Sequence, residues 1–179
     1  APKVPEEKPK VPEQQRVNYR ITDDALGTGG AKTKYARNVE AIRTLRRIEG
    51  EGRLATSEEQ EVLAQYVGWG GLPQVFDEKN ENWGKEYAEL KELLSEPEYN
   101  AARASTLNAH YTSPTVVKAI YGTLERMGLA SGNILEPACG TGNFFGLVPE
   151  SMAEAKLYGV ELDGITGRIA RQLYQKADI

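Results

Sequence analysis

Apolar side chains recur at helical spacing along much of this chain. In residues 35–48 they fall at every third or fourth position, and Gly50 and Gly52 follow, which predicts an amphipathic helix that ends at the glycines. The same periodicity predicts further helices over 57–67, around 85–94, from 97 to about 104, and over 114–127. The segment 18–106 is therefore expected to form a helical region.

Two of these helices carry start signals. Residues 57–60 (SEEQ) match a capping box, so Ser57 is predicted to begin the second helix, and Gly68 is a candidate for its C-cap. Ser113 is a favourable N-cap, and Pro114 suits the first helical position that follows it.

Two short apolar runs near the end of the chain predict strands. The first, 133–136, ends in an acid and leads into a turn with Gly140 and Gly142, after which a helix is expected to open at Asn143. The second, 157–163, also ends in acids. Strand, glycine turn, helix, strand and acid in this order predict an α/β fold with a nucleotide-type cofactor site.

The turn has the residue types that such a site needs. Glycines let the backbone approach a ligand closely. Glu161 stands roughly 20 residues after Gly142, the usual separation of a cofactor turn from its ribose-binding acid. Phe145 occupies the place of the third glycine of the dinucleotide pattern, which disfavours NAD and favours another adenosine cofactor. The alternative is an ordinary strand-to-helix turn with a structural glycine pair.

Three segments carry a resemblance to a known family. Residues 136–144 (EPACGTGNF) resemble motif I of the S-adenosylmethionine-dependent adenine-N6 DNA methyltransferases, 159–163 (GVELD) resemble their motif II, and 110–114 (HYTSP) resemble their motif X. Residues 66–72 (YVGWGGL) resemble the segment before the methylase domain in methylase–helicase proteins of phages and conjugative elements. The resemblance covers roughly residues 18–179.

The resemblance implies a fold, a cofactor and a set of contacts. It implies a helical N-terminal region followed by an incomplete Rossmann-like methyltransferase domain over 107–179, with S-adenosylmethionine as cofactor. Gly140 and Gly142 would hold the methionine portion, and Glu161 would accept the ribose hydroxyls. The implied cofactor-binding residues are Tyr111, Thr112, Ser113, Glu136, Ala138, Gly140, Gly142, Asn143, Phe144, Glu161 and Asp163.

One family motif has no counterpart in these residues. The Asn/Asp-Pro-Pro-aromatic motif, which would hold the target amine, is absent because no Pro-Pro dipeptide occurs. A third strand is expected to start at 176–179, so we expect the cofactor-binding part of a methyltransferase, inactive alone and without catalytic residues of its own. The alternatives are a DNA- or partner-binding scaffold of a mobile-element protein, and a fragment of a protein or RNA methyltransferase.

Charge bears on the partner. The net charge of −4 gives no global attraction to nucleic acid, so a DNA-binding surface would have to be local. Residues 32–47 supply one candidate, with a single acid, Glu40, among many bases. The predicted DNA-binding residues are Lys32, Lys34, Arg37, Arg43, Arg46 and Arg47. A solvated helix face is the alternative for this run, and Trp69 either stacks on a base or packs between helices.

The remaining composition sets the cellular context. Residues 1–17 are rich in Pro, Lys and Glu and predict an extended linker. Cys139 is the only cysteine and His110 the only histidine, so neither a disulfide nor a metal centre is expected. No apolar run reaches membrane-spanning length, so we expect a cytoplasmic protein. The resemblance implies a bacterial or phage origin. The start at Ala1 suggests a piece of a longer protein, whose remainder or a second copy would cover the open sheet edge.

Overall fold

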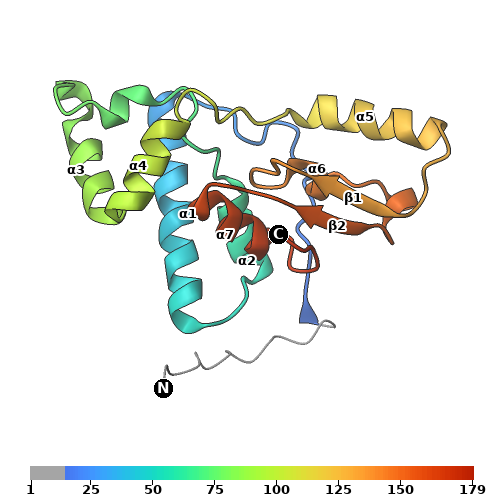
Figure 1. The fold of residues 1–179 in the computed structure, drawn as a ribbon. Coiled ribbons are helices and arrows are strands. Elements are labelled where there is room, and N and C mark those ends of the chain that lie inside the picture. The colour runs from blue at the N-terminus through green and yellow to red at the C-terminus, as the bar shows by residue number, and fades with distance from the viewer. Residues whose placement is uncertain (1–14) are drawn as a thin grey trace, which may run out of the picture.

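The computed structural model describes residues 15–179, and it is an α-rich mixed fold with a small two-stranded parallel sheet (Figure 1). Residues 1–14 of the linker predicted over 1–17 therefore lie outside the described part of the chain. The helices are α1 (Ala31–Glu51), α2 (Ser57–Ala64), α3 (Gly84–Leu93), α4 (Glu96–Ser105), α5 (Pro114–Arg126), α6 (Asn143–Gly146) and α7 (Gly164–Leu173), and the strands are β1 (Asn133–Glu136) and β2 (Lys156–Gly159). Short 3₁₀ turns are η2 (Pro73–Phe76), η3 (Glu81–Trp83) and η4 (Glu150–Met152).

The predicted helices are confirmed, with corrections at both ends of α2. Its N-cap is Thr56, not Ser57: the Glu59 amide donates to Thr56 Oγ1 over 3.3 Å, and the Glu59 carboxylate accepts the Thr56 amide over 2.9 Å. The helix ends at Ala64 and not at Val67. Beyond it, the Asn38 side chain of α1 accepts from the Val67 amide and donates to a backbone carbonyl, so side-chain contacts replace helical hydrogen bonds.

An aromatic cluster forms the centre of the helical region. Trp69 is 1% exposed and packs edge-on against Phe76, with ring centroids 5.6 Å apart, and at 6.3 Å from Tyr35. Tyr35 also meets Trp83 edge-on, and Phe76 meets Tyr99. Trp69 therefore packs between helices and is not available to stack on a base.

Both predicted strands are present, but β2 ends at Gly159 and not at Asp163. β1 and β2 are parallel, with Asn133 opposite Lys156 and Glu136 opposite Gly159. On the other side of β2, the Gly159 amide donates to the Asp178 carbonyl over 2.7 Å, and a parallel bridge joins Tyr158 to Asp178. Where a third strand was expected to start, residues 15–179 thus show a single bridge next to β2, on the side away from β1, and not a strand.

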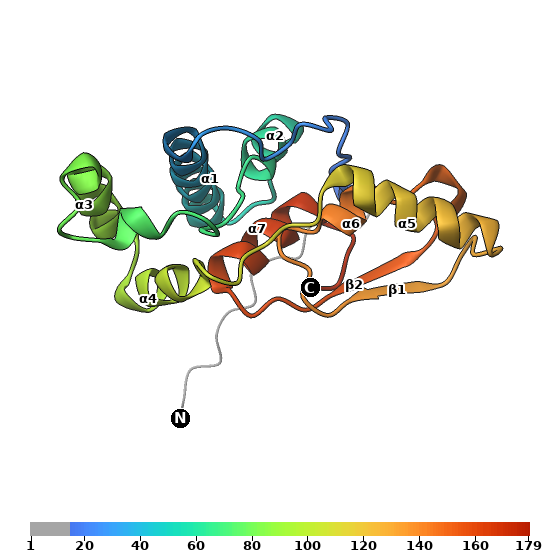
Figure 2. The ribbon, with the colours of Figure 1, turned by 90° about the horizontal axis from the view of Figure 1, so that it is seen from above.

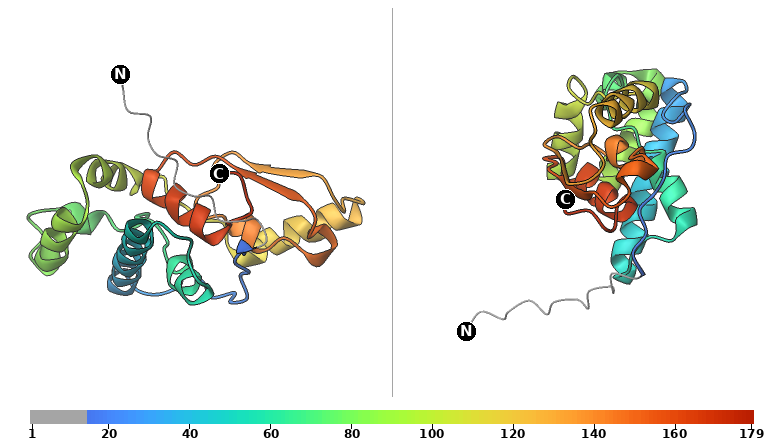
Figure 3. Two further views of the ribbon diagram at one scale, coloured as in Figure 1. Left: turned by 90° about the horizontal axis from the view of Figure 1, so that it is seen from below. Right: turned by 90° about the vertical axis from the view of Figure 1, so that its right-hand side faces the viewer.

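Helices cover one face of this sheet. α5, α6 and α7 lie on the same side of the two strands in the views from above and below (Figures 2 and 3). The other face leaves Leu135 64% exposed. The apolar stripe predicted over 114–127 is only partly buried, because Val117 and Tyr121 face the core while Met127, the C-cap of α5, is 78% exposed.

α7, which the apolar runs did not predict, joins the two regions. It packs against α1 and α2, and its Arg168 binds Glu49 of α1 and Glu98 of α4. The Nε2 of the Gln60 side chain in α2 donates to the carbonyls at the end of α7. The helical region and the sheet therefore share one hydrophobic core. Within residues 15–179, no helix is both long and apolar enough to cross a membrane.

Candidate functional site

The turn after β1 is fixed by backbone hydrogen bonds to the residues after β2. The Cys139 amide donates to the Val160 carbonyl, and the Val160 amide donates to the Glu136 carbonyl, each over 3.0 Å. Gly140 and Gly142 have φ values of 56° and 87°, which other residues rarely adopt. The helix predicted to open at Asn143 is confirmed, but only as the single turn α6, so its dipole contributes little at this site.

Tyr111 lies directly against this turn. A Cβ atom built on Gly140 would stand 2.8 Å from the Tyr111 ring, and one built on Gly68 would stand 3.0 Å from the other edge of the same ring. The Asn143 side chain also donates to the Thr112 carbonyl over 3.1 Å. The segment 110–114 and the glycine turn, which the sequence singled out separately, are therefore adjacent in space.

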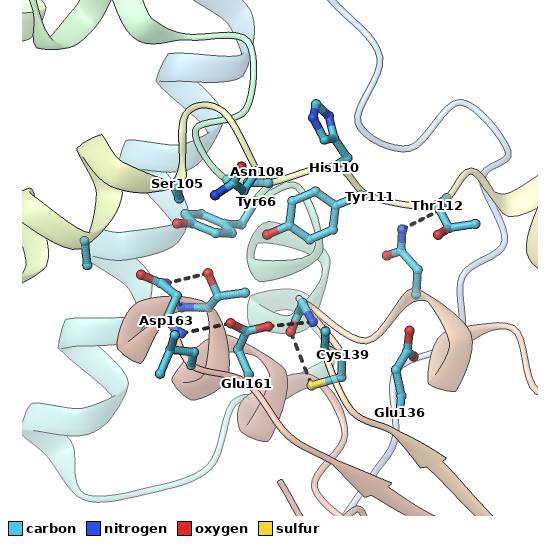
Figure 4. A pocket seen from close by; sticks show the side chains of 18 of the residues that line it. Tyr66, Ser105, Asn108, His110, Tyr111, Thr112, Glu136, Cys139, Glu161 and Asp163 are labelled. Carbon is cyan, nitrogen blue, oxygen red and sulfur yellow. Dashed lines mark hydrogen bonds between the residues drawn. The ribbon is translucent and has the colours of Figure 1, made fainter.

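Glu161 connects the ends of both strands. Its Oε2 accepts the Gly140 amide and its Oε1 accepts the Asp163 amide, both over 2.8 Å (Figure 4). Each carboxylate oxygen keeps a free lone pair for a ligand. Asp163 caps α7 instead, because its Oδ1 accepts both the amide and the hydroxyl of Thr166.

A cavity of about 470 Å³ opens above these groups. It lies at the carboxyl ends of the two strands, where open α/β sheets bind ligands. All predicted cofactor residues line it except Ser113 and Gly142. Ser113 lines a neighbouring hollow, and Gly142 lies behind the turn, where an added Cβ would stand 2.4 Å from the Tyr174 ring. Ligand contact by these two is therefore not supported.

The opposite wall of the cavity comes from the helical region, which the motif comparison did not assign to the site. Ser105 and Asn108 at the end of α4 face Glu161 and Asp163 across the opening, and Tyr66 stands beside them (Figure 4). The wall residues missed from the sequence are Tyr66, Gly68, Ala101, Ala104, Ser105, Asn108, Ala109, His110, Cys139, Leu162 and Thr166. For Ala101, Ala104 and Ser105 the spacing of small residues on α4 was the only signal. Others lie within segments that carry the family resemblance, namely Tyr66, Gly68, His110, Cys139 and Leu162.

Burial shifts the acid–base properties of the lining. Glu136 Oε2 is buried without a hydrogen-bond partner, and desolvation raises the pKa of this carboxyl from 4.5 to about 7. Burial likewise raises the pKa of the Cys139 thiol to about 11, so the thiol stays protonated at neutral pH. The lining carries Glu136, Glu161 and Asp163 but no lysine or arginine among the described residues. Its charge favours a neutral or cationic ligand.

The basic run of α1 is balanced by acids of other elements. Lys32, Arg43, Arg46 and Arg47 each pair with a glutamate, at N···O distances of 2.6–3.2 Å. Those glutamates are Glu86, Glu89, Glu98 and Glu59. Arg37 donates to the Thr28 carbonyl, and Lys34 lines the same small hollow as Ser113. DNA contact by this face stays a prediction.

The residues 15–179 hold no group of three or more His, Cys, Asp or Glu side chains that fits a metal ion. Comparison of the sequence with family models and curated proteins, and of the structure with solved structures, found no match.

Proposed function

We propose that the cavity at the ends of β1 and β2 binds S-adenosylmethionine. The chain would then be the cofactor-binding part of a Rossmann-like adenine-N6 DNA methyltransferase. The observation that carries this proposal is the Glu161 carboxylate, which joins the glycine turn to the end of β2 inside the cavity. The placement of Asp178 beside β2 supports it too, because the Rossmann order sets its third strand on the far side of the second.

The lining fits this cofactor better than a dinucleotide. S-adenosylmethionine carries a sulfonium and an ammonium group, whereas the pyrophosphate of NAD carries negative charge that a lining of acids would repel. The unpaired Glu136 Oε2 is a suitable acceptor for the ammonium group. The volume lies within the usual range of small-molecule sites.

Glu161 and Tyr111 would have distinct tasks in the cavity. Glu161 would hold the ribose hydroxyls, and the bound cofactor would supply an activated methyl group. The Tyr111 ring would fix the glycine turn and exclude water from one side of the cavity. No residue here is assigned to hold the target amine, since the Pro-Pro motif is absent from these residues. DNA would be the substrate of the longer protein, with its target base flipped out of the duplex.

A pH experiment tests the role of Glu136. Its carboxyl keeps a proton to about pH 7 in the folded state, whereas the unfolded chain releases it near 4.5. Since the folded state binds more protons in this window, its stability falls as pH rises through it. We expect Glu136→Gln to melt several degrees above the wild type at about pH 8, and level with it at about pH 4, below the pKa of the unfolded carboxyl.

The same variant is expected to bind S-adenosylmethionine more weakly at the higher pH, because it lacks the anionic acceptor. Exposed Glu154→Gln serves as control and should change neither property. A stability gain that is equal at both pH values would contradict the titration of Glu136 in this range.

A radioactive assay tests the proposed division between binding and catalysis. In equilibrium dialysis with tritiated S-adenosylmethionine, we expect the chain to retain label reversibly. With unmethylated DNA present, we expect no incorporation of label, because positioning of the target amine is worth up to ~7–11 kcal/mol in such reactions. Incorporation would show that catalytic residues have been overlooked, and a failure to retain label would contradict cofactor binding.

A further inference from the structure

A second hollow, of about 500 Å³, lies at the end of the molecule away from the sheet. It is formed by η2, α3 and α4, which Figures 1 and 2 place at the far side of α1 from α5. We call it the α3–α4 groove. Its lining residues are Pro73, Phe76, Asp77, Glu78, Lys79, Tyr87, Lys91, Tyr99, Arg103 and Thr106.

The bases of this groove differ from those of α1. Lys79, Lys91 and Arg103 are exposed, and none of them forms an ion pair with an acid of residues 15–179. Asp77 and Glu78 also line the groove, but the Asp77 carboxylate accepts the Lys79 amide of its own turn. The groove therefore keeps cations that are free to meet phosphates, whereas the bases of α1 are largely satisfied within the fold.

Aromatic rings stand between these cations. Tyr87 is half-buried and meets Tyr99 edge-on, with ring centroids 6.5 Å apart and an interplanar angle of 89°. The Lys91 ammonium lies 4.3 Å from the centre of the Tyr99 ring. Interleaved cations and aromatic rings are the pattern that binds single-stranded nucleic acid, through phosphate contacts and base stacking.

Helix α4 places this groove next to the cavity. One side of α4, together with the residue just after it, lines the groove through Tyr99, Arg103 and Thr106. Ala101, Ala104 and Ser105 on the other side line the cavity. A strand held in the groove would thus lie one helix diameter, about 10 Å, from the cavity.

We propose that the α3–α4 groove binds a single-stranded segment of nucleic acid, with phosphates on Lys79, Lys91 and Arg103 and a base against Tyr87. This assigns nucleic-acid contact to the groove rather than to the basic run of α1. It does not require a cofactor in the cavity, so the two proposals fail separately.

Fluorescence anisotropy with a labelled single-stranded DNA oligonucleotide of mixed sequence, titrated at several salt concentrations, tests the proposal. The variant Lys79→Gln/Lys91→Gln/Arg103→Gln should flatten the slope of log affinity against log salt by about 2. The matched variant Arg43→Gln/Arg46→Gln/Arg47→Gln should leave the slope unchanged. Melting curves check that both variants are folded.

A third variant separates stacking from charge. Tyr87→Leu should weaken binding about tenfold and leave the salt slope unchanged, since it removes only the ring. Absence of binding by the wild type would overturn the proposal. It would also be overturned by equal flattening in both charge variants, or by equally tight binding of poly-glutamate that does not depend on Tyr87.

Discussion

Replacing Gly142 by alanine is expected to lower the free energy of unfolding by about 3 kcal/mol, through left-handed backbone strain and overpacking. Gly142 has φ of 87°, and its added Cβ would stand 2.4 Å from the Tyr174 ring. That ring is fully buried and packs edge-on against Phe145, so it has no room to move. In a protein of this size the melting temperature should fall by roughly 10 °C.

Gly50→Ala is the matched control. Gly50 lies inside α1, and nothing stands within 4 Å of its added Cβ. Alanine should stabilise this exposed helical position by about 0.5–1 kcal/mol. If Gly142→Ala melted within about 2 °C of the wild type in calorimetry, a shift of about 0.5–1 kcal/mol at most, the turn would not have the conformation described for it.

The second large effect concerns ligand affinity. Glu161→Ala removes the acceptor of the Gly140 and Asp163 amides and the proposed partner of the ribose hydroxyls. Hydrogen bonds to a charged group contribute about 1–3 kcal/mol, so the dissociation constant for S-adenosylmethionine should rise roughly 10- to 100-fold. Isothermal titration calorimetry measures this change.

Glu154→Ala controls for the loss of one negative charge, since Glu154 is exposed and lies outside the cavity lining. It should bind the cofactor as the wild type does. Equal affinities of the wild type and Glu161→Ala, with both proteins folded by melting, would remove Glu161 from the site.

Local patterns in the sequence predicted most elements but not all of them. The periodic helices and both strands follow from side-chain spacing, which depends on neighbouring residues alone. α7 was not predicted although Ile165, Ile169 and Leu173 recur at helical spacing, because Gly164 and Gly167 in its first turns disfavour a helix.

The start of α2 shows where local rules become ambiguous. Thr56 to Glu59 and Ser57 to Gln60 both match the capping-box pattern. The tertiary structure selects the first, because the Gln60 side chain donates to carbonyls of α7 and Glu59 also binds Arg53. Neither contact is visible in the segment itself.

Part of the candidate site could be predicted from local sequence, and part depends on tertiary packing. The glycine turn and Glu161 were predictable because their chemistry requires particular residue types at a particular spacing. The wall from α4 was not, since Ala101 and Ala104 matter only for the space that they leave. The ion pairs of α1 likewise depend on where α3 and α4 pack. The basic run in the sequence therefore could not show how many of its positive charges are neutralised by acids of other helices.

The location of the ligand is the central claim, and amide chemical shifts measured by NMR during titration with S-adenosylmethionine test it most directly. We predict shifts confined to the cavity lining, at Tyr111 and Thr112, at Ala138, Gly140 and Asn143, and at Glu161 to Asp163. The amides of the α3–α4 groove should not move. Saturating cofactor that shifts no amide of the turn, or shifts the groove instead, would contradict the proposed site.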